Sequence, residues 1–301
     1  MRNQVYGAGV SGGAGGNDGA MTLRRLSFVL LLLAPLLFAL SPGAVAERQW
    51  APLAAATVHP GVQTLTEGSQ CTANFVFSDP DHVYLGQAAH CSGAGGGQDL
   101  DGCSAPSMPV GTKVVVGGAS KPGTMVYNSW LTMQARHETD ADACQYNDLA
   151  LVQLDPADVG KVNPSVPFWG GPTGVNSSGT PLGTEVYSYG NSSLRMGLSA
   201  LSPKRGVGLG DEGGGWSHDV LTVTPGIPGD SGSAFLDSAG GALGVLSTLD
   251  IGVPGGLTNG VGDLRHELDY LHAHTPFKDV ELVPGTAPFN GGRLPVGLGL
   301  L

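Results

Sequence analysis

The chain has 301 residues, of which 50 are Gly and 21 are Pro, and because both residue types interrupt helices this composition excludes a helix bundle or coiled coil. Hydrophobic residues make up 41% of the chain and charged residues 13%, which favours a packed core over bulk disorder. The net charge of −11 argues against a nucleic-acid partner, since phosphate attraction requires an excess of Lys and Arg.

An apolar run near the N-terminus has the layout of a secretory signal. Arg24 and Arg25 precede the run Leu26–Leu40, and small residues ending in Ala46 follow it. The run is shorter than the roughly twenty apolar residues that a membrane-spanning helix needs. We therefore expect residues 1–46 to be an N-terminal extension and signal peptide that is cleaved after Ala46. The product would be secreted and extracellular, with an uncleaved membrane anchor as the alternative.

Cysteine usage fits this compartment. All four cysteines, Cys71, Cys91, Cys103 and Cys144, follow residue 46. An even number in an oxidising compartment favours two disulfides, for which three pairings are possible. Zinc sites usually contain close ligand pairs such as C-x-x-C, which this sequence lacks. We expect neither a metal nor another cofactor.

Short strands dominate the prediction for the chain after residue 46. The first two strands flank the turn-forming run Ser78–Asp81 and are predicted to form a hairpin. Gly-, Pro- and Ser-rich loops separate the others, and this pattern is typical of an all-β sandwich or barrel. The predicted strands are Thr72–Phe77, His82–Gln87, Lys113–Val116, Thr124–Met133, Leu149–Leu154, Glu185–Tyr189, Val220–Thr224, Ser233–Leu236 and Ala242–Thr248.

One helix is predicted near the C-terminus. Leu264, Leu268 and Leu271 have the spacing of one helical face within residues 262–274, and Pro276 ends the pattern. The Pro- and Gly-rich segment that follows, 277–301, is expected to be a poorly ordered tail or to lie on the surface. The sequence thus predicts a single globular domain over residues 47–276.

Three segments supply the residues of a nucleophilic site. Ala88-Ala89-His90-Cys91 follows a predicted strand, Asn147-Asp148-Leu149 enters another, and Gly229-Asp230-Ser231-Gly232 lies between two. A serine hydroxyl needs an imidazole to accept its proton, and the imidazole needs a carboxylate to orient it. Glycines beside the serine allow a tight turn that presents the amides of Gly229 and Ser231 to an oxyanion.

These segments resemble the signature segments of the chymotrypsin-like (trypsin-fold) serine proteases, in the secreted bacterial branch. The resemblance extends from about Cys71 to Leu271. It implies two packed six-stranded antiparallel β-barrels with a C-terminal α-helix. It also implies that His90 is the general base, Asp148 its orienting partner and Ser231 the nucleophile.

The resemblance also implies how the cysteines pair and where the sequence departs from the family. Cys71 and Cys91 match the bridge beside the catalytic histidine, which leaves Cys103 to pair with Cys144. Animal members begin with Ile-Val-Gly-Gly, whose new N-terminal amine pairs with the aspartate before the serine. This start is absent here. Asp230 therefore needs another cation, for which Arg195 is the candidate.

Alignment on the serine places four residues at the substrate pocket. Pro225 falls at the base of the pocket, where members that cut after Arg or Lys have an Asp. Ser247 and Leu249 fall on one wall and Gly256 on the other, and the Ser247 hydroxyl is expected to support Asp148. Because a buried cation without a carboxylate is costly, we expect the pocket to accept small or medium apolar side chains.

The sequence thus predicts a secreted, monomeric serine endopeptidase that hydrolyses protein or peptide substrates through an acyl-enzyme. It would have no membrane association after signal cleavage. The alternative is a catalytically silent binding or adhesion protein with the same fold. An intact triad and the glycine at position 229 favour the enzyme, since silent members commonly lose one of these features.

Overall fold

The computed structural model describes residues 48–94, 101–253 and 256–295. The predicted extension and signal peptide, 1–46, lie outside the described residues. From Arg48 onward the described chain belongs to one compact unit. Within the described ranges, no helix is both long and apolar enough to cross a membrane.

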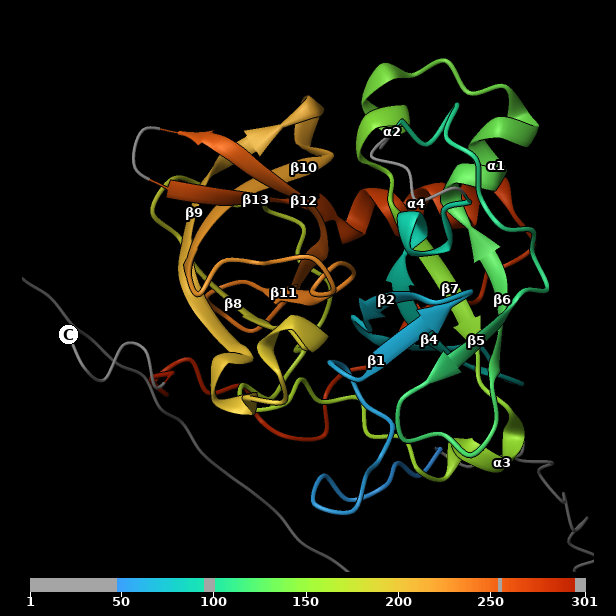
Figure 1. Ribbon diagram of the computed structural model, residues 1–301, viewed down its shortest axis with the longest axis horizontal. Coiled ribbons are helices and arrows are strands. Elements are labelled where there is room, and N and C mark those ends of the chain that lie inside the picture. Colours follow the sequence, from blue (N-terminus) through green and yellow to red (C-terminus); the bar gives the residue numbers. More distant parts are fainter. Residues whose placement is uncertain (1–47, 95–100, 254–255, 296–301) are drawn as a thin grey trace, which may run out of the picture. The chain divides into compact units, whose positions relative to one another are not determined.

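A closed barrel of six antiparallel strands forms the second half of the unit, drawn in yellow to orange in Figure 1. The strand order around the barrel is β10-β13-β12-β11-β8-β9. These strands are β8 (Glu185–Tyr189), β9 (Pro203–Glu212), β10 (Ser217–Val223), β11 (Ala234–Leu236), β12 (Ala242–Val253) and β13 (Gly256–Asp263). This barrel agrees with the predicted fold class.

The first half forms a second antiparallel sheet, with eight strands in the order β14-β3-β4-β7-β6-β5-β1-β2. Its members are β1 (Gln63–Thr66), β2 (Ser69–Thr72), β3 (Val76–Ser78), β4 (Val83–Ala88), β5 (Lys113–Val116), β6 (Gly123–Asn128), β7 (Leu149–Gln153) and β14 (Glu281–Leu282). The described pairing does not confirm a second closed barrel of six strands. The fold is therefore one closed barrel and one larger antiparallel sheet.

Strands β9 and β13 are absent from the predicted elements because both are rich in glycine, which is depleted in strands. The structure gives a steric reason for two glycines of the barrel. A Cβ at Gly206 of β9 would collide with the Leu221 carbonyl oxygen, and one at Gly244 of β12 with the Gly262 carbonyl oxygen. Close approach of neighbouring backbones therefore requires glycine at these positions.

Most of the other predicted strands are found with small shifts. Of Thr72–Phe77, however, only Thr72 lies in β2 and Val76 and Phe77 in β3, and residues 73–75 are not in a strand. Residues 124–133 were predicted as one strand, but β6 ends at Asn128 and the helix α1 (Ser129–Arg136) follows. The Asn128 side chain accepts a hydrogen bond from the Leu131 amide and thereby caps this helix. The second half of the strand prediction is therefore wrong, because the cap outweighs the β propensity of Trp130 and Thr132.

The predicted C-terminal helix is present as α4 (Leu264–His274), with Asp263 as its N-cap. Leu264, Leu268 and Leu271 are buried as the spacing predicts. Two short helices, α2 (Ala141–Tyr146) and α3 (Pro156–Val159), were not predicted. One apolar cluster contains residues of the sheet, the barrel and α4, and it packs the two halves together.

The segment after α4, which was expected to be poorly ordered or to lie on the surface, is described as far as residue 295. Its strand β14 pairs with β3 at the edge of the eight-stranded sheet, and the Val283 amide donates to the Val76 carbonyl at 2.9 Å. Val280 is 1% exposed. Further along, the Asn290 amide donates to the Trp169 carbonyl. Residues 277–295 are therefore part of the packed domain, because they supply edge pairing and buried apolar side chains.

Candidate active site

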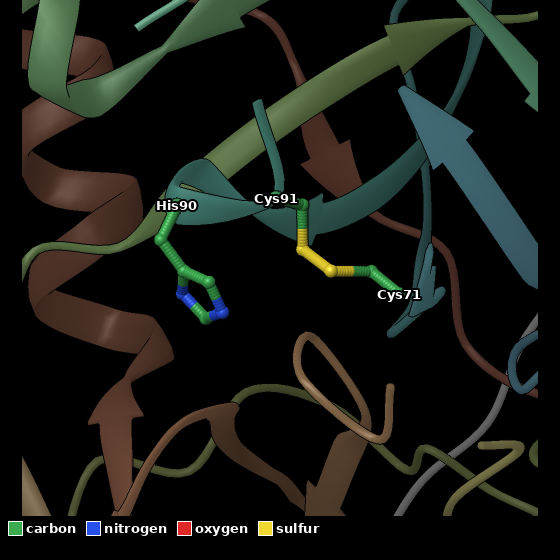
Figure 2. A group of neighbouring side chains, drawn as sticks. All are labelled: Cys71, His90 and Cys91. Carbon is green, nitrogen blue, oxygen red and sulfur yellow. A yellow bond between two sulfur atoms is a disulfide. The ribbon is translucent and has the colours of Figure 1, made fainter. Parts of the chain in front are cut away.

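His90 lies on a short 3-10 turn, η1 (Ala89–Ser92), directly after β4. The neighbouring Cys91 forms a disulfide with Cys71 of β2, so the turn is covalently attached to a second strand. Figure 2 shows the imidazole and the disulfide side by side on this turn. The Ala89 amide also donates to the Asp148 carbonyl at 2.8 Å, which fixes the turn against the start of β7.

The disulfides decide how the cysteine clusters are interpreted. The structure contains the bridges Cys71–Cys91 and Cys103–Cys144, which is the pairing that the resemblance implies. His90 lies close enough to Cys71 and Cys91 for the three side chains to share a metal ion. Both sulfur atoms are nevertheless held in the bridge, so neither offers a thiolate ligand while the bridge is intact.

Asp148 is buried and orients the His90 ring. One carboxylate oxygen, Oδ1, accepts the His90 amide at 2.8 Å, and Oδ2 lies 2.6 Å from His90 Nδ1. Oδ2 also accepts the Ser247 hydroxyl at 2.6 Å, which confirms the support predicted from Ser247. From α4, the Glu267 carboxyl accepts the Asp148 main-chain amide at 3.0 Å. The carboxylate is therefore held from η1 and β12, and the Asp148 main chain is held from α4.

These contacts determine the electrostatics of the imidazole. The His90 side chain is 18% exposed. Burial lowers the pKa of His90, but the charge and hydrogen bond of Asp148 outweigh burial and hold that pKa above its ordinary value. The Nδ1 contact leaves Nε2 as the ring nitrogen that can exchange a proton with a neighbour.

Ser231 lies on the turn before β11, where the two halves of the domain meet. Its carbonyl accepts the Thr72 amide of β2 at 2.8 Å, while the next amide, that of Gly232, donates to Leu246 of β12 at 2.7 Å. Gly232 has a φ of 85°, and a Cβ there would lie 2.6 Å from the Thr72 carbonyl oxygen. Only glycine fits this close approach.

The turn places Ser231 among the residues of a pocket, half-buried, and no hydrogen bond joins its hydroxyl to His90 within the described ranges. Ser247 connects the two groups indirectly, because it lines the same pocket as Ser231 and donates to Asp148. The nucleophile–base hydrogen bond of such sites is often long in the unliganded state and tightens when substrate binds.

The peptide group between Pro228 and Gly229 has a fixed orientation. Gly229 has a φ of 92°, and the Ser192 hydroxyl donates to the Pro228 carbonyl at 2.6 Å. Because the N–H and C=O of a trans peptide point in opposite directions, this bond directs the Gly229 N–H away from Ser192. Gln70 and Thr72 donate to the Gly229 carbonyl at 2.9 and 2.8 Å. Hydrogen bonds to the Pro228 carbonyl and to the Gly229 carbonyl therefore hold the turn before Ser231.

Asp230 is fully buried and pairs with two cations. Arg195, the predicted partner, lies 2.6 Å from Oδ2, and Lys204, which sequence reasoning missed, lies 3.0 Å from the same oxygen. The amides of Ser192 and Ile227 also donate to this carboxylate. Burial raises the pKa of Asp230, but the charges of Lys204 and Arg195 outweigh burial and hold that pKa below its ordinary value.

The pocket beside Ser231 has a volume of about 170 Å³. Of the four residues predicted for it, Ser247 and Leu249 line its walls, and Pro225 directly precedes the lining residue Gly226; the surroundings of Gly256 lie outside what the structure describes. Its lining is Gly226, Ile227, Pro228, Ser231, Leu246, Ser247, Thr248, Leu249 and Asn259.

Asn259 of β13 connects the two walls of this pocket and was not predicted. Its Oδ1 accepts the Gly226 amide at 2.8 Å, and its Nδ2 donates to the Thr248 carbonyl at 3.0 Å. The side chain is 1% exposed. Neither Asn259 nor Lys204 belongs to a local motif, so spacing along the sequence gave no signal for them. Their contacts arise only when distant strands pair in the barrel.

The chain matches no protein-family model and no curated protein. It is similar to solved structures of bacterial proteases. Protease A of Thermobifida fusca is 17% identical, with 77% of this chain and 100% of that chain covered and a TM-score of 0.49. Cellulomonas bogoriensis chymotrypsin is 17% identical (75% and 98% covered, TM-score 0.46), and the Nocardiopsis protease is 19% identical (75% and 99% covered, TM-score 0.46).

Proposed function

We propose that this chain is a serine endopeptidase that hydrolyses peptide bonds through an acyl-enzyme. The observation that carries the proposal is the oriented pair of His90 and Asp148, with Nδ1 and Oδ2 2.6 Å apart, which Ser247 connects to the pocket that Ser231 lines. An imidazole held in one orientation by a buried carboxylate is the arrangement that activates a neighbouring hydroxyl.

The proposed roles follow from the donors and acceptors at each atom. His90 Nε2 accepts the proton of the Ser231 hydroxyl as Oγ attacks the scissile carbonyl carbon. The Gly229 and Ser231 amides stabilise the oxyanion, and His90 then protonates the leaving amine. Water hydrolyses the acyl-enzyme by the same proton transfers in reverse. Because the base must be neutral and its pKa is raised, activity should decline on the acid side from above the ordinary histidine pKa of 6.5.

The substrate class is proposed from the pocket lining. Leu246, Leu249 and Ile227 give it apolar walls, and no Asp or Glu is among the lining residues. An Arg or Lys side chain would be buried there without a carboxylate partner, which is unfavourable. We therefore expect cleavage after small or medium apolar residues. Peptide substrates that vary only at this residue test the expectation, and a strong preference for Arg or Lys contradicts it.

The proposal includes the compartment and the maturation of the protein. The mature enzyme would be a secreted monomer that begins near Glu47, with the protease domain at 47–276 completed by the packed segment after α4. The eight-stranded sheet would occupy the place of the first barrel of the family. Asp230 has two cations of its own, which makes a new N-terminal amine unnecessary. N-terminal sequencing of the active species should therefore give a start near Glu47.

A fluorophosphonate probe tests the catalytic proposal directly, because it reacts only with an activated serine. We expect the purified wild-type protein to be labelled and the Ser231→Ala variant to remain unlabelled. Ser233→Ala is the matched control, since this neighbouring serine is fully buried and its hydroxyl donates to the Asp230 carbonyl. Folded wild-type protein that is not labelled would instead favour the alternative, a catalytically silent binding or adhesion protein.

A further inference from the structure

Lys204 is a buried charged residue that the proposed mechanism does not use. It lies on β9 and is 0% exposed. A lysine is almost never fully buried unless it is paired, because an ammonium loses its hydration when it leaves water. The partners of Lys204 therefore show what the side chain does in the fold.

Each N–H of this ammonium has an acceptor. Lys204 Nζ lies 3.0 Å from Asp230 Oδ2, and it donates to the carbonyl oxygens of Thr224 at 3.1 Å and Pro225 at 3.3 Å. Arg195 bridges the same groups, with 2.6 Å to Asp230 Oδ2 and 3.1 Å to the Pro225 carbonyl. Lys204 and Arg195 therefore join the carboxylate of Asp230, the residue before Ser231, to the turn that contains Pro225.

The turn that Lys204 holds is strained. Thr224 has a φ of 59°, a left-handed conformation that β-branched residues rarely adopt. Such a conformation persists only where the surrounding structure enforces it. Among the described residues, only Lys204 contacts both the Thr224 and the Pro225 carbonyl: Arg195 contacts that of Pro225, and the Thr222 hydroxyl that of Thr224.

This turn leads directly into the pocket wall formed by Gly226, Ile227 and Pro228. The space around Lys204 is filled on the opposite side as well. A Cβ at Gly190 would lie 2.8 Å from Lys204 Cε and would collide with Asp230. The ammonium therefore has little room to move, and its position fixes the carbonyls at the start of the wall.

We propose that Lys204 is a positioning residue of the substrate pocket: it ties the turn at Thr224 and Pro225 to Asp230 and thereby sets how tightly the pocket holds an apolar side chain. This inference rests on the proposed function, which makes the pocket the substrate site. It extends that function by making substrate affinity depend on the ammonium.

A pH dependence follows from the contacts. The charged groups that face Lys204 are Asp230 and Arg195, and the arginine stays charged throughout the accessible range. Burial lowers the pKa of Lys204 to about 8, although Asp230 opposes the decrease. Above that pH the amine is neutral and loses one N–H, so the ties to the two carbonyls weaken. The pocket should then bind apolar residues less tightly.

Peptide binding in a Ser231→Ala background tests the inference without requiring turnover. The ligands are acetylated tetrapeptides that differ only in their last residue, Ala, Val or Leu, and calorimetry gives each Kd near pH 7 and at about pH 9.5. Lys204→Met removes the charge but keeps an unbranched stem. Lys121→Met is the control, because that lysine is 58% exposed in a surface pair with Asp155.

We expect Lys204→Met to weaken binding of the best peptide about tenfold near pH 7, as loss of hydrogen bonds from a charged donor implies. In the background protein, the affinity for the peptide should decrease by a similar factor from the lower to the higher pH. Lys204→Met should show no such decrease, and Lys121→Met should behave like the background protein. Unchanged affinity in Lys204→Met, a pH dependence that persists in it, or no peptide binding at either pH would overturn the inference.

If Lys204→Met does not fold, the pH titration is made in a Ser231→Ala, His90→Ala background, so that the imidazole cannot contribute, with a midpoint near 8 expected and a constant affinity as the contrary result. The fluorophosphonate experiment remains separate. Labelled wild-type protein with pH-independent binding would keep the proposed function and discard the role of Lys204. Unlabelled protein with the expected pH dependence would discard the catalytic part of the proposed function and keep Lys204 as a positioning residue of a pocket that only binds peptides.

Discussion

Two buried aspartates, one in each half of the domain, are stabilised in different ways. Asp148, beside the eight-stranded sheet, accepts hydrogen bonds from the His90 amide, the His90 ring and the Ser247 hydroxyl. Asp230, in the barrel half, pairs with the cations Arg195 and Lys204. The first carboxylate thus faces neutral or titrating donors, and the second faces full charges.

In the proposed mechanism the two carboxylates have different roles. A permanent cation beside Asp148 would neutralise it and lower the pKa of His90, which would weaken the base. Asp230 has no imidazole to tune, and its contacts instead hold the turn that carries Ser231. We therefore expect substitutions around Asp148 to reduce activity and substitutions around Asp230 to reduce stability as well.

The largest expected effect concerns the reacting groups themselves. Ser231→Ala and His90→Ala should each reduce kcat/KM by about 10⁶-fold, because residues that act as one unit lose their joint effect when either is removed. Circular dichroism should show folded protein in both cases. Either variant retaining more than about a hundredth of wild-type activity would contradict the assignment.

The contrast between the aspartates is tested by matched substitutions. Asp148→Asn should lower kcat by roughly 10⁴-fold with a small change in the free energy of unfolding, because the amide orients the imidazole wrongly. Asp230→Asn should cost about 3 to 5 kcal/mol of that free energy, because two cations are left buried without a counter-charge. Urea unfolding and steady-state kinetics on both variants provide the measurements. Equal losses of stability would remove the distinction.

A smaller effect is expected from Ser247→Ala, which deletes one donor to Asp148. Loss of a hydrogen bond to a charged acceptor should reduce kcat/KM about tenfold. The carboxylate then interacts more strongly with the imidazole, so the pKa of His90 should rise and the acid limb of the pH profile should move to higher pH. Thr248→Ala, a neighbour that lines the same pocket, is the control and should leave that limb unchanged.

The smallest effect on activity is expected from Glu267→Gln. Glu267 is 0% exposed, and burial raises its pKa well above 4.5, so the folded protein keeps a proton that the unfolded chain loses. The stability that this proton contributes is complete below pH 4.5 and is lost as pH rises. Glutamine also accepts a hydrogen bond from the Asp148 amide, but it does not titrate, so the variant does not lose this stability as the pH rises.

The melting temperature of Glu267→Gln should therefore exceed that of the wild type by an amount that grows between pH 4.5 and 8, with near-normal turnover. A difference that stays constant over this interval would show that the carboxyl is ionised in the folded state. Glu281→Gln, an exposed glutamate of β14, should show no such growth.

Much of the fold follows from local sequence. Lys113–Val116 and Glu185–Tyr189 are strands with the predicted bounds, since β-branched and aromatic residues lie between turn-forming residues there. Strands β9 and β13 escaped prediction because their glycines serve contacts with neighbouring strands. The helix after Asn128 escaped it because a capping side chain, and not composition, ended the strand.

The candidate site also contains some residues that the sequence could predict and others that it could not. Motifs in the sequence mark His90, Asp148 and Ser231, whose catalytic roles remain predictions. The absence of the Ile-Val-Gly-Gly start indicated that Asp230 needs another cation, and this pointed to Arg195. Lys204 and Asn259 have no such mark. Each is a polar residue in a strand whose partners lie in the loop between β10 and β11 or, for Asn259, also on β12, and only the closed barrel determines these contacts.

The strand β14 also affects how this chain can be shortened or extended. By pairing with β3 it covers the edge of the eight-stranded sheet, where unpaired N–H and C=O groups would otherwise invite another chain to add a strand. A chain ended after Pro276 would expose that edge together with the apolar surface beneath Val280 and Leu282. We expect such a truncation to aggregate on refolding, whereas an affinity tag joined beyond residue 295 should be tolerated.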